Sequence, residues 1–84
     1  MIGGLKEKVV IVTGGGHGIG RAYCHGFAEA GAKVVAADID APAAEKVAAE
    51  VVQQFDGKAL GLKVDVANEM STKDMAKIAL DKYG

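Results

Sequence analysis

The sequence has few of the features that stabilise or anchor a small secreted protein. Its 84 residues include one cysteine, one proline and no tryptophan. A single cysteine cannot close an internal disulfide, which excludes a disulfide-stapled secreted domain. Residues 1–7 lack the charged and then apolar layout of a signal peptide. The apolar run Val9–Val12 is far shorter than the roughly 20 residues that span a bilayer.

The chain also lacks an excess of positive or negative charge. Ten Lys and Arg residues oppose 11 Asp and Glu residues, for a formal net charge of −1. A balanced charge offers no electrostatic attraction for nucleic acid or for an acidic membrane surface. We therefore expect a cytoplasmic protein with no nucleic-acid partner and no membrane partner. The length allows one domain at most, since typical domains have about 100–150 residues.

Glycine is the residue in excess. The chain has 12 glycines in 84 residues, about twice the usual share of ~7%. Five of them fall within seven consecutive positions, namely Gly14, Gly15, Gly16, Gly18 and Gly20.

Short β-branched runs alternate with helical apolar stripes along the whole chain. We predict strands over 8–13, 33–38 and 58–66, each followed by a helix. The continuous apolar run of the first strand is typical of a strand buried on both faces. Asp40 before Pro42 and Asn68 before the last segment predict the N-caps of the second and third helices.

The apolar spacing also predicts which face of each helix is buried. The residues expected to face inward are Ile19, Ala22, Tyr23, Gly26, Phe27 and Ala30 in the first helix, Ala44, Val47, Ala48, Val51, Val52 and Phe55 in the second, and Met75, Ile78, Ala79 and Tyr83 in the third. A βαβαβα order implies an α/β fold with a parallel sheet, because helical crossovers join parallel neighbours. Right-handed crossovers would place the first two helices on one face and give strand order 3-2-1.

The glycine cluster joins the end of the first strand to the start of the first helix. Free amides and the helix dipole favour an anion at such a position, and glycines let a diphosphate approach the backbone. A glycine-rich tight turn is the alternative. The nucleoside-triphosphatase loop requires Lys and Ser/Thr after its last glycine, whereas Arg21 and Ala22 follow Gly20. The spacing present is T-G-x-x-x-G-x-G, starting at Thr13.

Two acidic residues end the second and third predicted strands. Asp38 lies 18 positions after Gly20, where a carboxylate can accept hydrogen bonds from an adenosine ribose and repel a 2′-phosphate, favouring NAD over NADP. The alternative is a solvated aspartate. Asp65 could bind an adenine amino group, with Val66 and Ile39 in apolar contact. It could equally stabilise the start of the third helix.

Arg21, Cys24 and His25 follow the glycine cluster closely in the chain. Arg21 could hold phosphate, cap the helix or lie solvated on the surface. Cys24 is expected to be a buried packing thiol and His25 a surface residue of the helix. The two histidines and the cysteine do not have zinc-ligand spacing, and we expect no metal site.

Together, the T-G-G-G-H-G-I-G loop, Asp38 and the pair Asp65-Val66 resemble the N-terminal part of the short-chain dehydrogenases/reductases. The resemblance extends over essentially the whole chain. It implies a partial Rossmann fold, doubly wound, with NAD as the cofactor. The cofactor-binding residues predicted on this basis are Gly14, Gly16, His17, Gly18, Ile19, Gly20, Asp38, Ile39, Asp65 and Val66.

The family's catalytic residues have no counterpart among the 84 residues. That family uses an Asn-Asn-Ala-Gly segment, a serine and a Tyr-x-x-x-Lys pair later in the chain. Here Asn68 is the only asparagine, Ser71 is the only serine, and neither Tyr23 nor Tyr83 has a lysine four positions on. We expect no catalytic residue here and no turnover by these residues alone.

Residues 1–84 are therefore predicted to be the N-terminal half of a dinucleotide-binding domain and a fragment of a longer chain. The parent protein is expected to interconvert a small-molecule alcohol and carbonyl by hydride transfer and to form a homo-oligomer. The alternative is a stand-alone nucleotide-binding or interaction module without catalysis, which could dimerise through its first strand.

Overall fold

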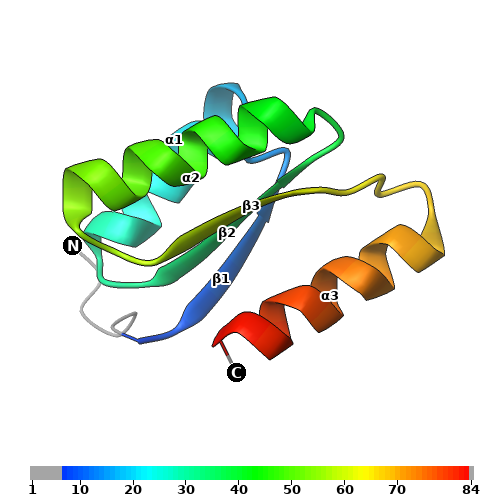
Figure 1. Ribbon diagram of the computed structural model, residues 1–84. Coiled ribbons are helices and arrows are strands. Elements are labelled where there is room, and N and C mark those ends of the chain that lie inside the picture. Colours follow the sequence, from blue (N-terminus) through cyan, green and yellow to red (C-terminus); the bar gives the residue numbers. More distant parts are fainter. Residues whose placement is uncertain (1–6, 84) are drawn as a thin grey trace.

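The computed structural model describes residues 7–83, which form a three-stranded sheet and three helices (Figure 1). The expectation about a signal peptide concerns residues 1–7, of which only residue 7 lies within this range. In chain order the elements are β1 (Val9–Thr13), α1 (Gly18–Glu29), β2 (Lys33–Asp38), α2 (Ala41–Phe55), β3 (Ala59–Lys63) and α3 (Glu69–Tyr83). The predicted βαβαβα order is confirmed.

All strand pairs are parallel, and β2 lies between β1 and β3. This is the predicted 3-2-1 order read from the opposite edge. The register pairs Thr13 with Ala37 and Asp38 with Lys63. The carboxyl ends of the three strands therefore meet at one edge of the sheet, which is where the predicted site residues follow.

The sheet is covered on both faces, by α1 and α2 on one side and by α3 on the other (Figure 1). The central strand β2 is buried from Val34 to Asp38. The main core lies between the sheet and the first two helices. It includes Val12, Val34 and Ala36 from the strands and Cys24, Val47 and Val51 from the helices.

The predicted caps of α2 and α3 are confirmed. A carboxylate oxygen of Asp40 accepts a 3.2 Å hydrogen bond from the amide of Ala43. The side-chain oxygen of Asn68 accepts a bond of the same length from the amide of Ser71. Helix α2 ends at Phe55 and is followed by its C-cap residue, Asp56, whose φ of 51° is left-handed.

β1 is less buried than its apolar run predicts. It forms an edge of the three-stranded sheet, and Val9 and Ile11 each keep 37% of their surface exposed. The burial on both faces that is typical of such a run is not reached within residues 7–83, because no described strand lies on the outer side of β1.

The buried face of α1 also differs from the predicted one. Cys24 and Ala28 are buried, whereas Ile19 and Tyr23 are exposed. Apolar spacing predicts Ile19 and Tyr23 to be inward, but the helix lies on the sheet by the strip that contains Cys24 and Ala28. The stripe of α2 is closer to expectation, with Val52 the exposed exception.

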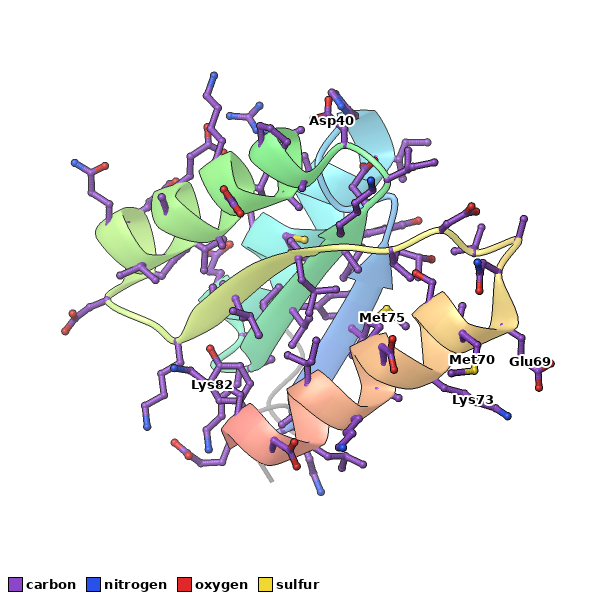
Figure 2. The ribbon with its side chains drawn as sticks, turned by 45° about the vertical axis from the view of Figure 1, so that its right-hand side comes forward. Asp40, Glu69, Met70, Lys73, Met75 and Lys82 are labelled. Carbon is purple, nitrogen blue, oxygen red and sulfur yellow. The ribbon has the colours of Figure 1, made fainter. Side chains whose placement is uncertain are left out.

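Helix α3 packs on the sheet through few residues, of which Ala79 is buried. Met75 is half-buried and points toward the strands, whereas Met70 and Lys73 lie on the face turned away (Figure 2). Ala79 is buried, but Ile78 is exposed, contrary to the predicted inward face.

Candidate cofactor-binding site

The glycine loop crosses from β1 to α1 at the carboxyl edge of the sheet. The amide of Gly15 donates a 3.1 Å hydrogen bond to the carbonyl of Ala37, which attaches the loop to β2. Gly18 has a φ of +51°, a left-handed conformation that glycine adopts without steric cost. A Cβ on Gly18 would meet no heavy atom within 4 Å, so the space beside this residue is open.

Gly20 is needed for a different reason. Its α-carbon lies so close to the loop that an added Cβ would collide with the backbone carbonyl of Gly14. The first turn of α1 therefore packs directly on the strand-to-loop junction, an approach that only a residue without a side chain allows.

Helix α1 lacks the side-chain cap that α2 and α3 have. Its N-cap residue is His17, whose side chain makes no capping hydrogen bond, and no acidic residue lies in the first turn. Among the described residues, no carbonyl or side chain accepts a hydrogen bond from the amides of Gly18, Ile19 or Gly20. These donors, together with the positive end of the helix dipole, form a suitable site for an anion.

Asp38 ends β2 beside this loop and is 92% buried, with 8% of its surface accessible. One carboxylate oxygen, Oδ2, accepts a 3.0 Å hydrogen bond from the amide of Gly16. The other, Oδ1, accepts a 3.0 Å bond from the amide of Asp40. The alternative of a solvated aspartate is wrong, because the carboxylate is enclosed and helps to hold the loop in place. Each oxygen retains a second lone pair for a ligand hydroxyl.

His17 and Asp40 form a second link between the loop and the segment after β2. The Nε2 atom of His17 lies 3.0 Å from Oδ2 of Asp40, and both side chains are largely exposed. This contact, together with the amide of Ala43, lowers the pKa of the Asp40 carboxyl. Spacing alone identified Asp40 only as a helix cap.

Three apolar residues predicted near the cofactor have unusually exposed side chains. Ile19, Ile39 and Val66 keep 74%, 64% and 67% of their surface exposed. They follow β1, β2 and β3 respectively, at the same sheet edge as Asp38. Exposed apolar side chains at one edge are suited to contact a flat ligand such as an aromatic base.

Asp65 has a local structural role. Its Oδ1 accepts a 3.0 Å hydrogen bond from the amide of Ala67, and its own amide donates to the hydroxyl of Ser71. These contacts shape the turn into α3, which is the structural interpretation left open by the sequence. The neighbouring residue Val64 bonds to the carbonyl of Asp38 at 3.0 Å, so Asp65 lies at the same edge as the loop.

Arg21 is bound to α2. Its Nε and Nη2 atoms each donate a 2.9 Å hydrogen bond to one carboxylate oxygen of Glu50. Nε2 of His25 lies 3.1 Å from Oε1 of the same carboxylate. These contacts lower the pKa of Glu50 to about 2, and the hydrogen bonds from Arg21 have the largest effect. The three residues clamp α1 to α2 beside the loop.

His25 is half-buried, so its expected place on the surface is wrong. Its ring also packs edge-to-face against Phe55, with centroids 5.9 Å apart. No spacing rule could have found this cluster, because Glu50 follows Arg21 by 29 residues.

Cys24 is fully buried beneath the glycine loop, as predicted. Its thiol points to the carbonyl of Gly15, at 3.8 Å. Removal from water raises the pKa of this thiol to about 11, so the group stays protonated and unreactive at neutral pH.

Within residues 7–83, no three His, Cys, Asp or Glu side chains gather to hold a metal ion. No helix in that range is long and apolar enough to cross a membrane.

A comparison with protein families finds one match, over residues 8–84, to a family described as short chain dehydrogenase. The chain is 41% identical over 80 residues to a 7alpha-hydroxysteroid dehydrogenase of Escherichia coli and 42% identical over 80 residues to an uncharacterized oxidoreductase of Thermotoga maritima. Each alignment covers 95% of this chain and 31% of the relative. The chain thus spans about a third of the length of these relatives.

Solved structures with the same arrangement are similar in sequence as well. A hydroxysteroid dehydrogenase from Escherichia coli has a TM-score of 0.90 at 41% identity, covering 95% of this chain and 32% of that one. A short chain dehydrogenase/reductase from Burkholderia phymatum, in complex with NAD, has a TM-score of 0.88 at 31% identity, covering 100% and 29%. A 3-ketoacyl-(acyl-carrier-protein) reductase from Brucella melitensis, complexed with NADH, has a TM-score of 0.85 at 38% identity, covering 94% and 31%.

Proposed function

Because this chain belongs to the short-chain dehydrogenase family, we propose that it binds the adenosine diphosphate part of NAD at the carboxyl edge of its sheet. Residues 1–84 are then the N-terminal half of a dinucleotide-binding Rossmann domain in a longer protein. The observation that carries the proposal is the uncapped N-terminus of α1 beside the buried carboxylate of Asp38.

The loop fits a diphosphate in shape and in charge. The amides of Gly18, Ile19 and Gly20 are free to donate, and the space beside Gly18 is open. We do not assign Arg21 to this binding, because its Nε and Nη2 atoms already donate to the carboxylate of Glu50. The positive charge available to the phosphates comes chiefly from the end of the α1 dipole.

Asp38 supports NAD over NADP. The carboxylate is buried and held in one orientation by two backbone amides, so it is fixed in place to accept hydrogen bonds from ribose hydroxyls. A 2′-phosphate would bring a second negative charge against a carboxylate that has little access to water, which is unfavourable. Ile39 and Val66 would contact the adenine, and Asp65 would receive its amino group.

When bound, the nicotinamide cofactor would accept a hydride from a small-molecule alcohol or supply one to a carbonyl. The described residues contribute binding and orientation only. The tyrosine, lysine and serine that would complete the chemistry are expected outside residues 1–84, and the homo-oligomer is expected of the whole protein. We propose that the protein acts in the cytoplasm.

Titration with NAD, NADP and ATP in parallel tests this function. NAD should bind most tightly, NADP more weakly, and ATP without any requirement for Mg²⁺, because no hydroxyl follows Gly20 to hold the metal. Isothermal titration calorimetry or quenching of NADH fluorescence gives the affinities. Tighter binding of ATP that depends on Mg²⁺ would contradict the proposal.

A further inference from the structure

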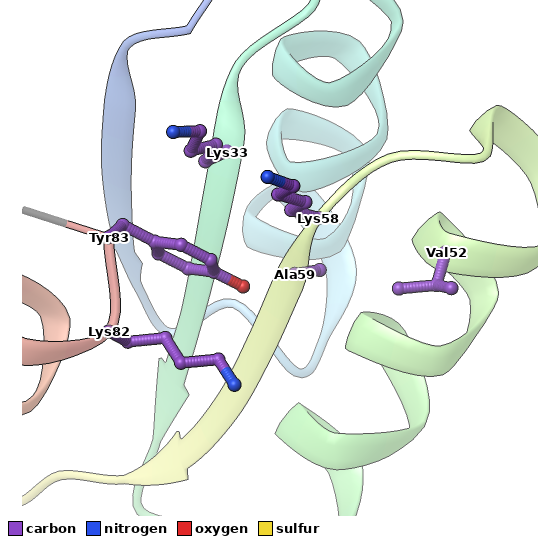
Figure 3. Close-up of a pocket in the computed structure, with 6 residues that line it drawn as sticks. All are labelled: Lys33, Val52, Lys58, Ala59, Lys82 and Tyr83. Carbon is purple, nitrogen blue, oxygen red and sulfur yellow. The ribbon is translucent and has the colours of Figure 1, made fainter.

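A second groove lies at the opposite end of the sheet from the glycine loop. It has a volume of about 480 Å³ and lies where β2 and β3 begin and α3 ends (Figure 3). Its lining comes from four elements or their flanks and consists of Lys33, Val52, Lys58, Ala59, Lys82 and Tyr83. Neither the proposed cofactor site nor the family comparison assigns a role to it.

The polar lining of the groove is cationic. Three of its six residues are lysines, and none is acidic. Figure 3 shows Tyr83 and Lys82 reaching from the end of α3 toward β3, with Lys33 and Lys58 on the other side of the tyrosine ring. Three ammonium groups in one groove are notable in a chain whose formal net charge is −1.

Only part of this charge is neutralised. Nζ of Lys33 lies 3.3 Å from a carboxylate oxygen of Glu7. Within residues 7–83, no carboxylate lies within 4 Å of the ammonium groups of Lys58 and Lys82. Two acidic residues at this end of the sheet, Glu7 and Asp56, line a neighbouring groove together with Lys33 and Lys58. Like charges gathered without counter-charges repel one another, and a bound anion would relieve that repulsion.

The rest of the lining suits an organic anion. Val52 and Ala59 supply an apolar wall, and the hydroxyl of Tyr83 is a hydrogen-bond donor. Tyr83 is partly buried, which raises its pKa and keeps the hydroxyl protonated. A volume of about 480 Å³ falls in the range of small-molecule sites, about 300–1,000 Å³, and is larger than a bare phosphate ion needs.

We propose that this groove binds the phosphate group of a small phosphate ester through Lys58, Lys82 and the hydroxyl of Tyr83. The groove lies at the far end of the strands from Gly14–Gly20, so this site is distinct from the cofactor site. Lys33 contributes charge from β2 while it remains paired with Glu7.

Nuclear magnetic resonance on the ¹⁵N-labelled protein tests the site, with inorganic phosphate and phenyl phosphate as probes at constant ionic strength. Both probes should shift the amides of Lys58 and Ala59, and phenyl phosphate should bind more tightly because of the apolar wall. Equal affinities would reduce the site to one for the phosphate ion alone and would overturn the ester proposal. Shifts confined to the amides of Gly14–Gly20 would overturn the site altogether.

Substitutions separate a defined site from general charge. Lys58→Gln and Lys82→Gln should each weaken phosphate binding about fivefold, the upper range for an exposed charged contact. Tyr83→Phe keeps the ring and should weaken binding less. Lys73→Gln is the matched control, because Lys73 lies on α3 with its ammonium paired with Glu69 at 3.2 Å. Equal losses in Lys73→Gln and Lys82→Gln would show non-specific attraction and contradict the proposal.

Discussion

The amide of Gly16 donates a 3.0 Å hydrogen bond to the buried carboxylate of Asp38, a residue 22 positions later in the chain. This bond joins the phosphate-binding loop to the residue proposed to select the cofactor. The carboxylate therefore has two tasks, to hold the loop and to receive a ribose. Substitutions can separate these two tasks, because the single oxygen of an amide can still accept a hydrogen bond from the loop but carries no negative charge.

Asp38→Asn should retain much of the loop geometry but lose selectivity. The asparagine oxygen can accept the hydrogen bond from Gly16, whereas its NH2 group cannot accept the bond from Asp40 and the negative charge is gone. We expect NAD affinity to fall about 10-fold, since a hydrogen bond to a charged group contributes roughly 1.5–3 kcal/mol, and the discrimination against NADP to shrink. Binding titrations with both cofactors measure the two effects.

Asp38→Ala should lose both tasks and so should also lower the thermal midpoint. Asp74→Asn is the control for charge, because Asp74 is exposed on α3. An unchanged ratio of NAD to NADP affinity in Asp38→Asn would remove Asp38 from the cofactor site.

Gly20→Ala should be strongly disruptive for a conservative change. The added methyl group would meet the backbone carbonyl of Gly14, which cannot rotate away as a side chain can. We expect a loss of about 1–3 kcal/mol in the free energy of unfolding, the usual cost of overpacking, and a loss of NAD binding. Urea denaturation and titration measure the two effects.

Gly26→Ala is the matched control within the same helix. A Cβ at Gly26 would meet nothing within 4 Å, and alanine favours a helix over glycine by up to about 1 kcal/mol. The variant should be at least as stable as the original protein. Similar destabilisation by both variants would mean that the contact between Gly20 and Gly14 is not the cause.

The clamp between α1 and α2 should make stability depend on acidity. Arg21 and His25 lower the pKa of Glu50 from 4.5 to about 2 in the folded protein. A carboxyl whose pKa is lower in the folded state favours folding above its unfolded pKa, and this contribution is lost as the pH falls toward the folded value. The stability difference between the protein and Glu50→Gln should therefore be largest above about pH 5 and shrink between pH 4.5 and 2. Urea melts across that range give the difference, and a constant difference would contradict the assignment.

The thiol of Cys24 should resist alkylation while the protein is folded. Burial raises its pKa by about two units, to about 11, which lowers the thiolate fraction roughly 100-fold, and the side chain has no exposed surface. Iodoacetamide should label the native protein at pH 8 at least about 100 times more slowly than the protein in urea. Mass spectrometry over time measures both rates, and comparable rates would show that the loop opens readily above the thiol.

The element order, the parallel sheet and the place of the glycine loop could all be predicted from the residues alone. Short-range rules carry this information, since apolar periodicity separates strands from helices and helical crossovers require parallel neighbours. The caps at Asp40 and Asn68 follow from the same local chemistry. The family pattern then placed Asp38 at the edge of the sheet next to the loop, where the structure has it.

The partners of each of these residues, in contrast, depend on how the helices and strands pack together. The clamp of Arg21 on Glu50 joins residues 29 positions apart on separate helices, and the lysine groove gathers its lining from residues 33–83. The packing of α1 on the sheet also leaves Ile19 and Tyr23 exposed while Cys24 is buried. The reason is physical: periodicity states that a helix has an apolar side, but the rotation of the helix on the sheet depends on which small residues allow the closest approach. In α1 those residues are Gly20, Cys24 and Ala28, whose small size a hydrophobic pattern does not rank.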